Sequence, residues 1–173
     1  AGDQARAIDY DAVVLDDIEA KFFTQDQLLL LRRFVSERGG GLLLLGGADA
    51  FDRAGYETTP LAELAPVYAV RDQAAKPTSP VQFSFTREGW LQPWMRLRAT
   101  EVSERDRLAG MPRFITWNMV ERTKPGATVL SYLNDPDQED TAKGDRPGLV
   151  VQRFGTGRCA VLLVGDLWRW GMH

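Results

Sequence analysis

Two short aliphatic runs on either side of a helix signature constrain the fold of this chain most strongly. Residues 13–15 and 42–45 are continuous apolar runs bounded by polar residues or glycine, a pattern typical of strands buried on both faces of a parallel sheet. Between them, Thr24 and Gln27 have capping-box spacing, and the glycines at 39–41 suit the end of a helix. These segments predict a strand–helix–strand unit, which is almost always right-handed with parallel strands.

The second half of the chain predicts strands in a different arrangement. Residues 149–154 and 159–164 are apolar stretches separated by Gly155-Thr156-Gly157, which is typical of an antiparallel hairpin. We also expect strands at 81–85 and 127–133, a helix at 103–109, a helical turn at 61–64, and polar loops at 71–80 and 134–147. At 173 residues the chain suits one domain, so the pattern predicts a single α/β domain.

Charge and composition exclude several classes of function. The chain has 21 Lys and Arg against 24 Asp and Glu, a net charge of −3, whereas nucleic-acid-binding proteins carry a basic excess or stripe. No apolar run approaches the roughly 20 residues of a membrane span. Cys159 is the one cysteine, so no intrachain disulfide forms and the redox compartment stays undecided. His173 is the one histidine and the last residue, which argues against a mechanism that needs a firmly held imidazole.

Carboxylates follow three of the predicted strands. Asp16 and Asp17 come after the first aliphatic run, Asp49 after the second, and Asp166 after the last predicted strand. Ligands of parallel α/β sheets bind beyond the carboxyl ends of the strands, and converging carboxylates bind hard cations such as Mg²⁺. Aspartate also caps helices and turns routinely. Capping is the stronger interpretation, and a carboxylate site is the alternative.

Two further segments are interpreted as structural. Gly46-Gly47 directly follow the second aliphatic run, where glycine permits a positive φ or a close backbone approach. The pair lacks the Lys-Ser/Thr of a phosphate-binding loop, so we interpret it mainly as a turn. The acidic segment 135–140 has Asp140 where an EF-hand needs glycine, so it is expected to be a solvated loop. We predict neither a metal nor a cofactor.

The tryptophans and the cysteine leave alternatives open. The chain has five tryptophans, which are Trp90, Trp94, Trp117, Trp168 and Trp170. Tryptophans most often fill a core or an interface, but they also line grooves for glycans or peptides. If their segment is extended, Trp168 and Trp170 share one face. Cys159 begins an apolar strand, so we expect a buried, unreactive thiol.

The order of these motifs resembles the class I glutamine amidotransferase-like superfamily, in particular its branch found in large bacterial membrane proteins. The matching segments are 10–16, 28–47 and 51–64, with Gly39-Gly40-Gly41, Gly46-Gly47, Gly55-Tyr56 and Thr59-Pro60-Leu61. The later segments 124–130 and 155–158, followed by Asp166 and Trp168-Arg169-Trp170, are also similar. The resemblance therefore covers nearly the whole chain.

The resemblance implies a flavodoxin-like three-layer α/β/α sandwich with a mostly parallel sheet and added antiparallel strands in the C-terminal half. Active amidotransferases carry a Cys on a strained turn after the aliphatic strand, and a His and an acidic residue near the C-terminal strand. Here the thiol position falls at Gly46 or Gly47 and the His position near Asp166 or Leu167. Because thiol catalysis needs both the thiolate and its base, we expect that glutamine hydrolysis is lost.

The same branch implies a setting and partners. It suggests an extracytoplasmic, periplasmic domain of a membrane protein, with a cytoplasmic location as the alternative. The domain is expected to be truncated at both ends, with a strand before Tyr10 and a helix after Trp170 lying outside it, so that exposed edges favour a homodimer. Its expected partners are proteins or other domains of the same chain.

The function expected from the sequence is therefore binding or assembly without catalysis. The alternatives are a hydrolase that uses the strand-end carboxylates, with or without a metal, and a sugar-binding module that uses the tryptophans. A ligand surface, where one exists, is expected at the carboxyl ends of the parallel strands. Its residues would be Asp16, Asp17, Gly46, Gly47, Asp49, Asp166 and Trp168.

Overall fold

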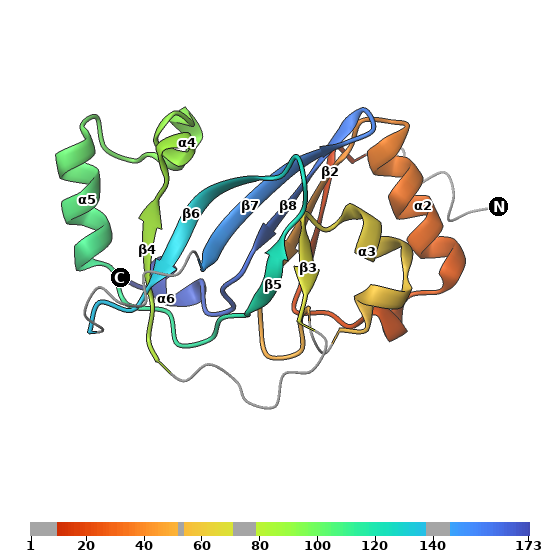
Figure 1. The fold of residues 1–173 in the computed structure, drawn as a ribbon, viewed down its shortest axis with the longest axis horizontal. Coiled ribbons are helices and arrows are strands. Elements are labelled where there is room, and N and C mark those ends of the chain that lie inside the picture. Colours follow the sequence, from red (N-terminus) through yellow and green to blue (C-terminus); the bar gives the residue numbers. More distant parts are fainter. Residues whose placement is uncertain (1–9, 52–53, 71–78, 138–145) are drawn as a thin grey trace.

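The computed structural model describes residues 10–51, 54–70, 79–137 and 146–173, and these form a mixed α/β fold around one six-stranded sheet (Figure 1). The strand order is β1-β2-β8-β7-β6-β4. The strands are β1 (Ala12–Asp16), β2 (Gly41–Leu45), β8 (Gly157–Leu162), β7 (Pro147–Phe154), β6 (Thr128–Asn134) and β4 (Gln82–Phe85).

The sheet is parallel on one side and antiparallel on the other. β1 pairs with β2, and β2 with β8, in parallel, while the pairings β8–β7, β7–β6 and β6–β4 are antiparallel. The strand–helix–strand unit predicted for the N-terminal part is confirmed, as is the hairpin around Gly155, whose φ is +59°. The sheet is less parallel than the resemblance implied, because antiparallel pairings outnumber parallel ones.

Helix α2 (Gln25–Ser36) follows the predicted signals closely. The Thr24 hydroxyl accepts a hydrogen bond from the Gln27 N–H at 3.3 Å, and the Gln27 side chain accepts one from the Thr24 N–H at 2.9 Å. This reciprocal pair satisfies two N–H groups that lack partners inside a helix. The buried side of α2 places Leu28, Phe34 and Val35 in the core.

One face of the sheet is covered by α2, by α3 (Pro60–Leu64) and by a two-stranded antiparallel ribbon (Figure 1). The ribbon consists of β3 (Val67–Ala69) and β5 (Val120–Thr123), which the sequence did not predict. Lys124 anchors it, because its ammonium donates hydrogen bonds to the backbone oxygens of Ala62 and Glu63. Most of the core lies between this layer and the sheet.

The opposite face of the sheet carries a row of mostly apolar side chains that are in register across the strands. The row runs through Val14, Leu43, Ala160, Val151 and Thr128, and we call it the open face. Val14 is 54% exposed and Leu43, Ala160 and Val151 are half-buried. The N-terminal strand was expected to be buried on both faces. That expectation was wrong because β1 lies at the sheet edge and contributes Val14 to the open face.

The remaining helices gather near β4 and β6 (Figure 1). They are α4 (Arg87–Trp90), α5 (Glu101–Gly110), α6 (Trp168–Gly171) and the short 3-10 helix η3 (Pro93–Met95). Two more 3-10 helices, η1 (Ala20–Phe22) and η2 (Tyr56–Thr58), are not part of this group. Of the polar loops expected at 71–80 and 134–147, residues 71–78 and 138–145 lie outside the described residues. No helix in the described ranges is long and apolar enough to cross a membrane.

The tryptophans do not form one surface. Trp168 and Trp170 lie on α6 and not on an extended segment, so they do not share a face: Trp168 is 60% exposed, whereas Trp170 packs against Phe114 at 4.9 Å between ring centres. Trp117 is buried. Trp94 is exposed and lines a cavity over the open face.

Candidate functional site

The carboxyl ends of β1, β2 and β8 meet at one edge of the sheet, and the segments that follow them lie close together. The Asp17 carboxylate follows β1 and accepts hydrogen bonds from the N–H groups of Ala48 (3.1 Å) and Asp49 (2.8 Å), which follow β2. A Cβ atom added to Gly165 would lie 2.7 Å from the Gly47 Cα atom. Parallel strand geometry therefore brings the Asp17, Gly46-Gly47 and Gly165 segments together, as the sequence predicted.

Two of the carboxylates at this edge act as caps of backbone N–H groups. Asp17 has a φ of +46°, a left-handed conformation that Asp tolerates better than most residues, and both of its oxygens accept N–H groups of the next turn. Asp166 is 4% exposed and accepts from the N–H groups of Ile115 (3.0 Å) and Thr116 (3.3 Å). The capping interpretation that the sequence favoured therefore describes both residues.

The carboxylates do not converge on one point. Asp17 faces the turn after β2, while Asp166 faces residues 115–116 and lies 3.6 Å from the Arg169 Nε atom. Asp16 and Asp49 are exposed. Within the described ranges, no group of three or more His, Cys, Asp or Glu residues could hold a metal ion.

Asn118 organises this edge, and the sequence analysis missed it. Its side-chain oxygen accepts from the Gly47 N–H at 3.0 Å, and its side-chain nitrogen donates to the Gly47 oxygen at 3.0 Å. The residue is buried, and its own N–H donates to the Leu163 oxygen. Asn118 thus ties the turn after β2 to the end of β8. No motif or spacing in the sequence marks it, because its partners lie about 45 and 71 residues away along the chain.

Close packing explains the glycines of this turn. A Cβ atom at Gly46 would lie 2.5 Å from the Asn118 Oδ1 atom and 2.9 Å from the Leu163 carbonyl carbon. One at Gly47 would overlap the Asp17 carboxylate. Both glycines are therefore required by the approach of neighbouring groups, which is the structural role that the sequence favoured.

Two buried groups, the Cys159 thiol and the Tyr56 hydroxyl, have raised pKa values and are neutral at pH 7. Cys159 is 1% exposed, and burial raises the pKa of its thiol to about 12, an effect that nearby Lys124 opposes only in part. The expected buried position of Cys159 is confirmed. Burial, together with the charge of Asp17, raises the pKa of Tyr56 to about 12, and its hydroxyl donates to the Ile18 oxygen.

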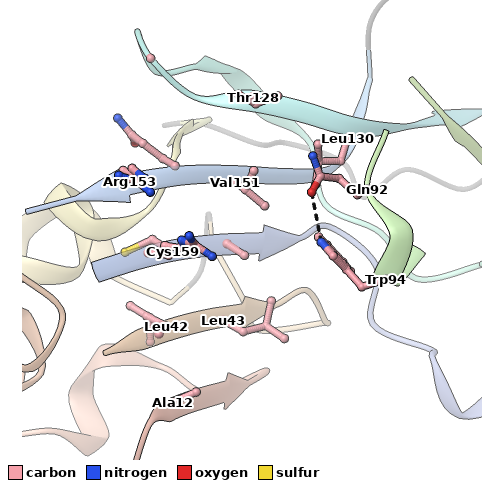
Figure 2. Close-up of a pocket in the computed structure, with 15 residues that line it drawn as sticks. Ala12, Leu42, Leu43, Gln92, Trp94, Thr128, Leu130, Val151, Arg153 and Cys159 are labelled. Atoms are coloured by element: carbon pink, nitrogen blue, oxygen red, sulfur yellow. Dashed lines mark hydrogen bonds between the residues drawn. The ribbon is translucent and has the colours of Figure 1, made fainter. Parts of the chain in front are cut away.

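Two cavities lie away from the predicted site residues. One, of about 670 Å³, lies over the open face, with Arg153 at one end and Gln92 and Trp94 at the other (Figure 2). Arg158, which is paired with Arg153 in the sheet, also lines it. The second, of about 640 Å³, lies beside η2 and the ribbon and is lined by Phe51, Tyr56, Glu57, Tyr68 and Glu121, among others. Neither is lined by Asp16, Asp17, Gly46, Gly47, Asp49, Asp166 or Trp168.

Comparison with known proteins gives a fold likeness. No family model and no curated protein matches the chain. Cytoplasmic protein STM1381 from Salmonella typhimurium LT2 superposes with a TM-score of 0.70 at 24% identity, over 97% of this chain and 65% of that one. Cytoplasmic protein STM3548 from Salmonella typhimurium gives 0.68 at 20% identity, over 93% and 63%. The β-galactosidase of Rahnella sp. R3 gives 0.55 at 14% identity, over 90% and 20%.

These likenesses support the fold, since all three identities are below 25%. The chain spans less than two thirds of the length of each of the two Salmonella proteins. Both are named cytoplasmic proteins, which overturns the expectation of an extracytoplasmic, periplasmic domain held between membrane anchors.

Proposed function

We propose that this chain is a non-catalytic domain of amidotransferase-like fold that acts by binding or assembly. The observation that carries the proposal is the turn after β2, where the resemblance places the catalytic thiol. Asn118 and the Leu163–Val164 backbone fill the space that a side chain at Gly46 would occupy. The single thiol, Cys159, is buried in β8 with a raised pKa, so it is a poor nucleophile.

The proposal includes a finer description of the fold. The parallel β1-β2-β8 core and the α2 and α3 layer support a flavodoxin-like three-layer sandwich. In that arrangement a second helical layer would lie over the open face, where α4 contacts β6 and η3 borders one end of the cavity. The molecule that the domain binds would then supply the rest of this second layer.

We infer a cytoplasmic setting for this binding role. The support is the naming of two proteins of similar fold as cytoplasmic. The hydrolase alternative is not favoured, because Asp17 and Asp166 are engaged by backbone N–H groups. The sugar-binding alternative is not favoured either, because the tryptophans are dispersed between the core and separate surfaces.

The test is an assay of ammonia release from glutamine. The purified protein is expected to release no more ammonia than a heat-inactivated sample. Gly46→Cys is expected to be equally inactive, because the position that the resemblance gives to the histidine base holds Asp166 or Leu167. Ammonia release by the unmodified protein above the inactivated control would overturn the proposal. An active amidotransferase assayed in parallel shows that the conditions support the reaction.

A further inference from the structure

The open face is an apolar surface wide enough to seat a helix. Five strands contribute to its row, so at about 4.8 Å per strand spacing it is about 19 Å wide, whereas a helix with side chains is about 10–12 Å across. Its centre is formed by Leu43, Ala160 and Val151, which are half-buried, and its edge by exposed Val14. α2 and α3 pack on the opposite face of the sheet (Figure 1).

A pair of arginines at one end of this face lacks compensating charge. Arg153 on β7 and Arg158 on β8 are directly paired in the antiparallel register and are both exposed. Both line the cavity over the open face, and no described residue forms an ion pair or hydrogen bond with either side chain. Like charges directly opposite each other in a sheet are destabilising, so this pair favours a partner that brings carboxylates.

An aromatic side chain borders the other end. Trp94 is 63% exposed, and its indole N–H already donates to the Gln92 side chain at 3.2 Å, as drawn in Figure 2. The indole ring therefore offers apolar contact area without an unsatisfied polar group. Exposed tryptophans and arginines around an apolar centre are the composition that dominates binding energy in protein interfaces.

We propose that the open face binds an amphipathic helix of a partner protein, with its apolar stripe on Leu43, Ala160 and Val151 and acidic residues against Arg153 and Arg158. This inference rests on the binding role proposed above and names the partner. The helix would bury the apolar row and neutralise the arginine pair. The bound helix would thereby form a second layer over the open face, on the side of the sheet opposite α2 and α3.

The test uses two synthetic helical peptides of about 18 residues, which is five turns. Both carry a leucine stripe, and they differ only in a pair of Glu or Lys residues placed at one end. Binding to the 173-residue protein is measured by calorimetry and by tryptophan fluorescence. The Glu peptide is expected to bind at least about tenfold more tightly than the Lys peptide, because charge complementarity sets partner choice.

A charge-reversed protein makes the test specific to this face. The double variant R153E/R158E is expected to lose binding of the Glu peptide and to bind the Lys peptide more tightly. The control is R33E/R122E, which changes charge equally at exposed positions away from the cavity and should leave both affinities unchanged. Circular dichroism establishes that each variant is folded.

Several outcomes would overturn the proposal. They are equal binding of both peptides, equal loss in R33E/R122E, and no binding at about 1 mM peptide, a concentration at which even weak contacts are detected. Self-association of the protein that R153E/R158E abolishes would assign the face to a second copy. Saturable binding of dodecanoate without peptide binding would assign it to a small anionic amphiphile. None of these results involves ammonia release, so they leave the test of the non-catalytic role independent.

Discussion

At the residue scale, Glu104 is a buried charge whose partners are all in place. It is 0% exposed, and its carboxylate accepts from the Leu97 N–H at 3.1 Å and the Arg107 Nε–H at 3.0 Å. Burial alone would raise its pKa, but Arg107 and the N–H groups of Leu97 and Arg98 outweigh burial and hold the pKa of Glu104 below the ordinary 4.5. The charged carboxylate therefore ties the loop before α5 to the helix.

Glu104→Ala is expected to destabilise the fold by about 3 kcal/mol, because it leaves Arg107 without its buried partner. Since the folded pKa is lowered, the stabilisation by Glu104 is present at neutral pH and is lost as pH falls from 4.5 through the folded value. Glu104→Gln should flatten this part of the pH dependence. Denaturant unfolding between pH 7 and pH 3 measures both effects, with exposed Glu101→Gln as the control. If the free energy of unfolding of Glu104→Gln fell with pH as steeply as that of the unmodified protein, the result would contradict the assignment.

Gly46→Ala tests the close packing of the turn after β2. The new methyl group would press on Asn118 Oδ1 and on the Leu163–Val164 backbone, so it is expected to lower the free energy of unfolding by about 1–3 kcal/mol. Gly110→Ala is the matched control, because a Cβ atom there meets no atom within 4 Å. Comparable losses in the two variants would show that the crowding at Gly46 has no energetic consequence.

At the element scale, elements with local sequence signals could be predicted, whereas pairings between strands far apart in the sequence could not. The strand–helix–strand unit was predictable because its aliphatic runs and the Thr24 capping box act over a few residues. The β3–β5 ribbon was not, since strands of three and four residues pair across more than 50 positions and carry no periodicity. At the site, parallel geometry predicted the approach of Asp17 to Gly47, while Asn118 depends on tertiary contacts alone.

Asn118 therefore offers a test of how the elements are joined. Asn118→Ala would leave the buried Gly47 N–H and oxygen without their partners, and an unsatisfied buried group costs about 1–3 kcal/mol. Asn118→Asp can still accept from the Gly47 N–H but cannot donate to the Gly47 oxygen, so it should also destabilise. Thermal unfolding measures both variants; a melting temperature equal to that of the unmodified protein in each would remove Asn118 from this role.

At the scale of the whole molecule, Cys159 reports on the cooperativity of folding. It lies in β8 between β2 and β7, it is buried, and its thiol has a pKa of about 12. Alkylation of the native protein should therefore be slow and should require opening of the sheet.

If the chain unfolds as one unit, Glu104→Gln should accelerate labelling of Cys159, although Glu104 lies on α5 at the far edge of the molecule. A loss of 1–2 kcal/mol corresponds to a factor of about 5–30 in the unfolded population, and the labelling rate should rise by the same factor. Quantification of the alkylated protein by mass spectrometry over time checks this, with unfolded protein giving the limiting rate. A variant that is less stable to denaturant but labels at the unchanged rate would mean that the sheet around β8 opens independently of α5.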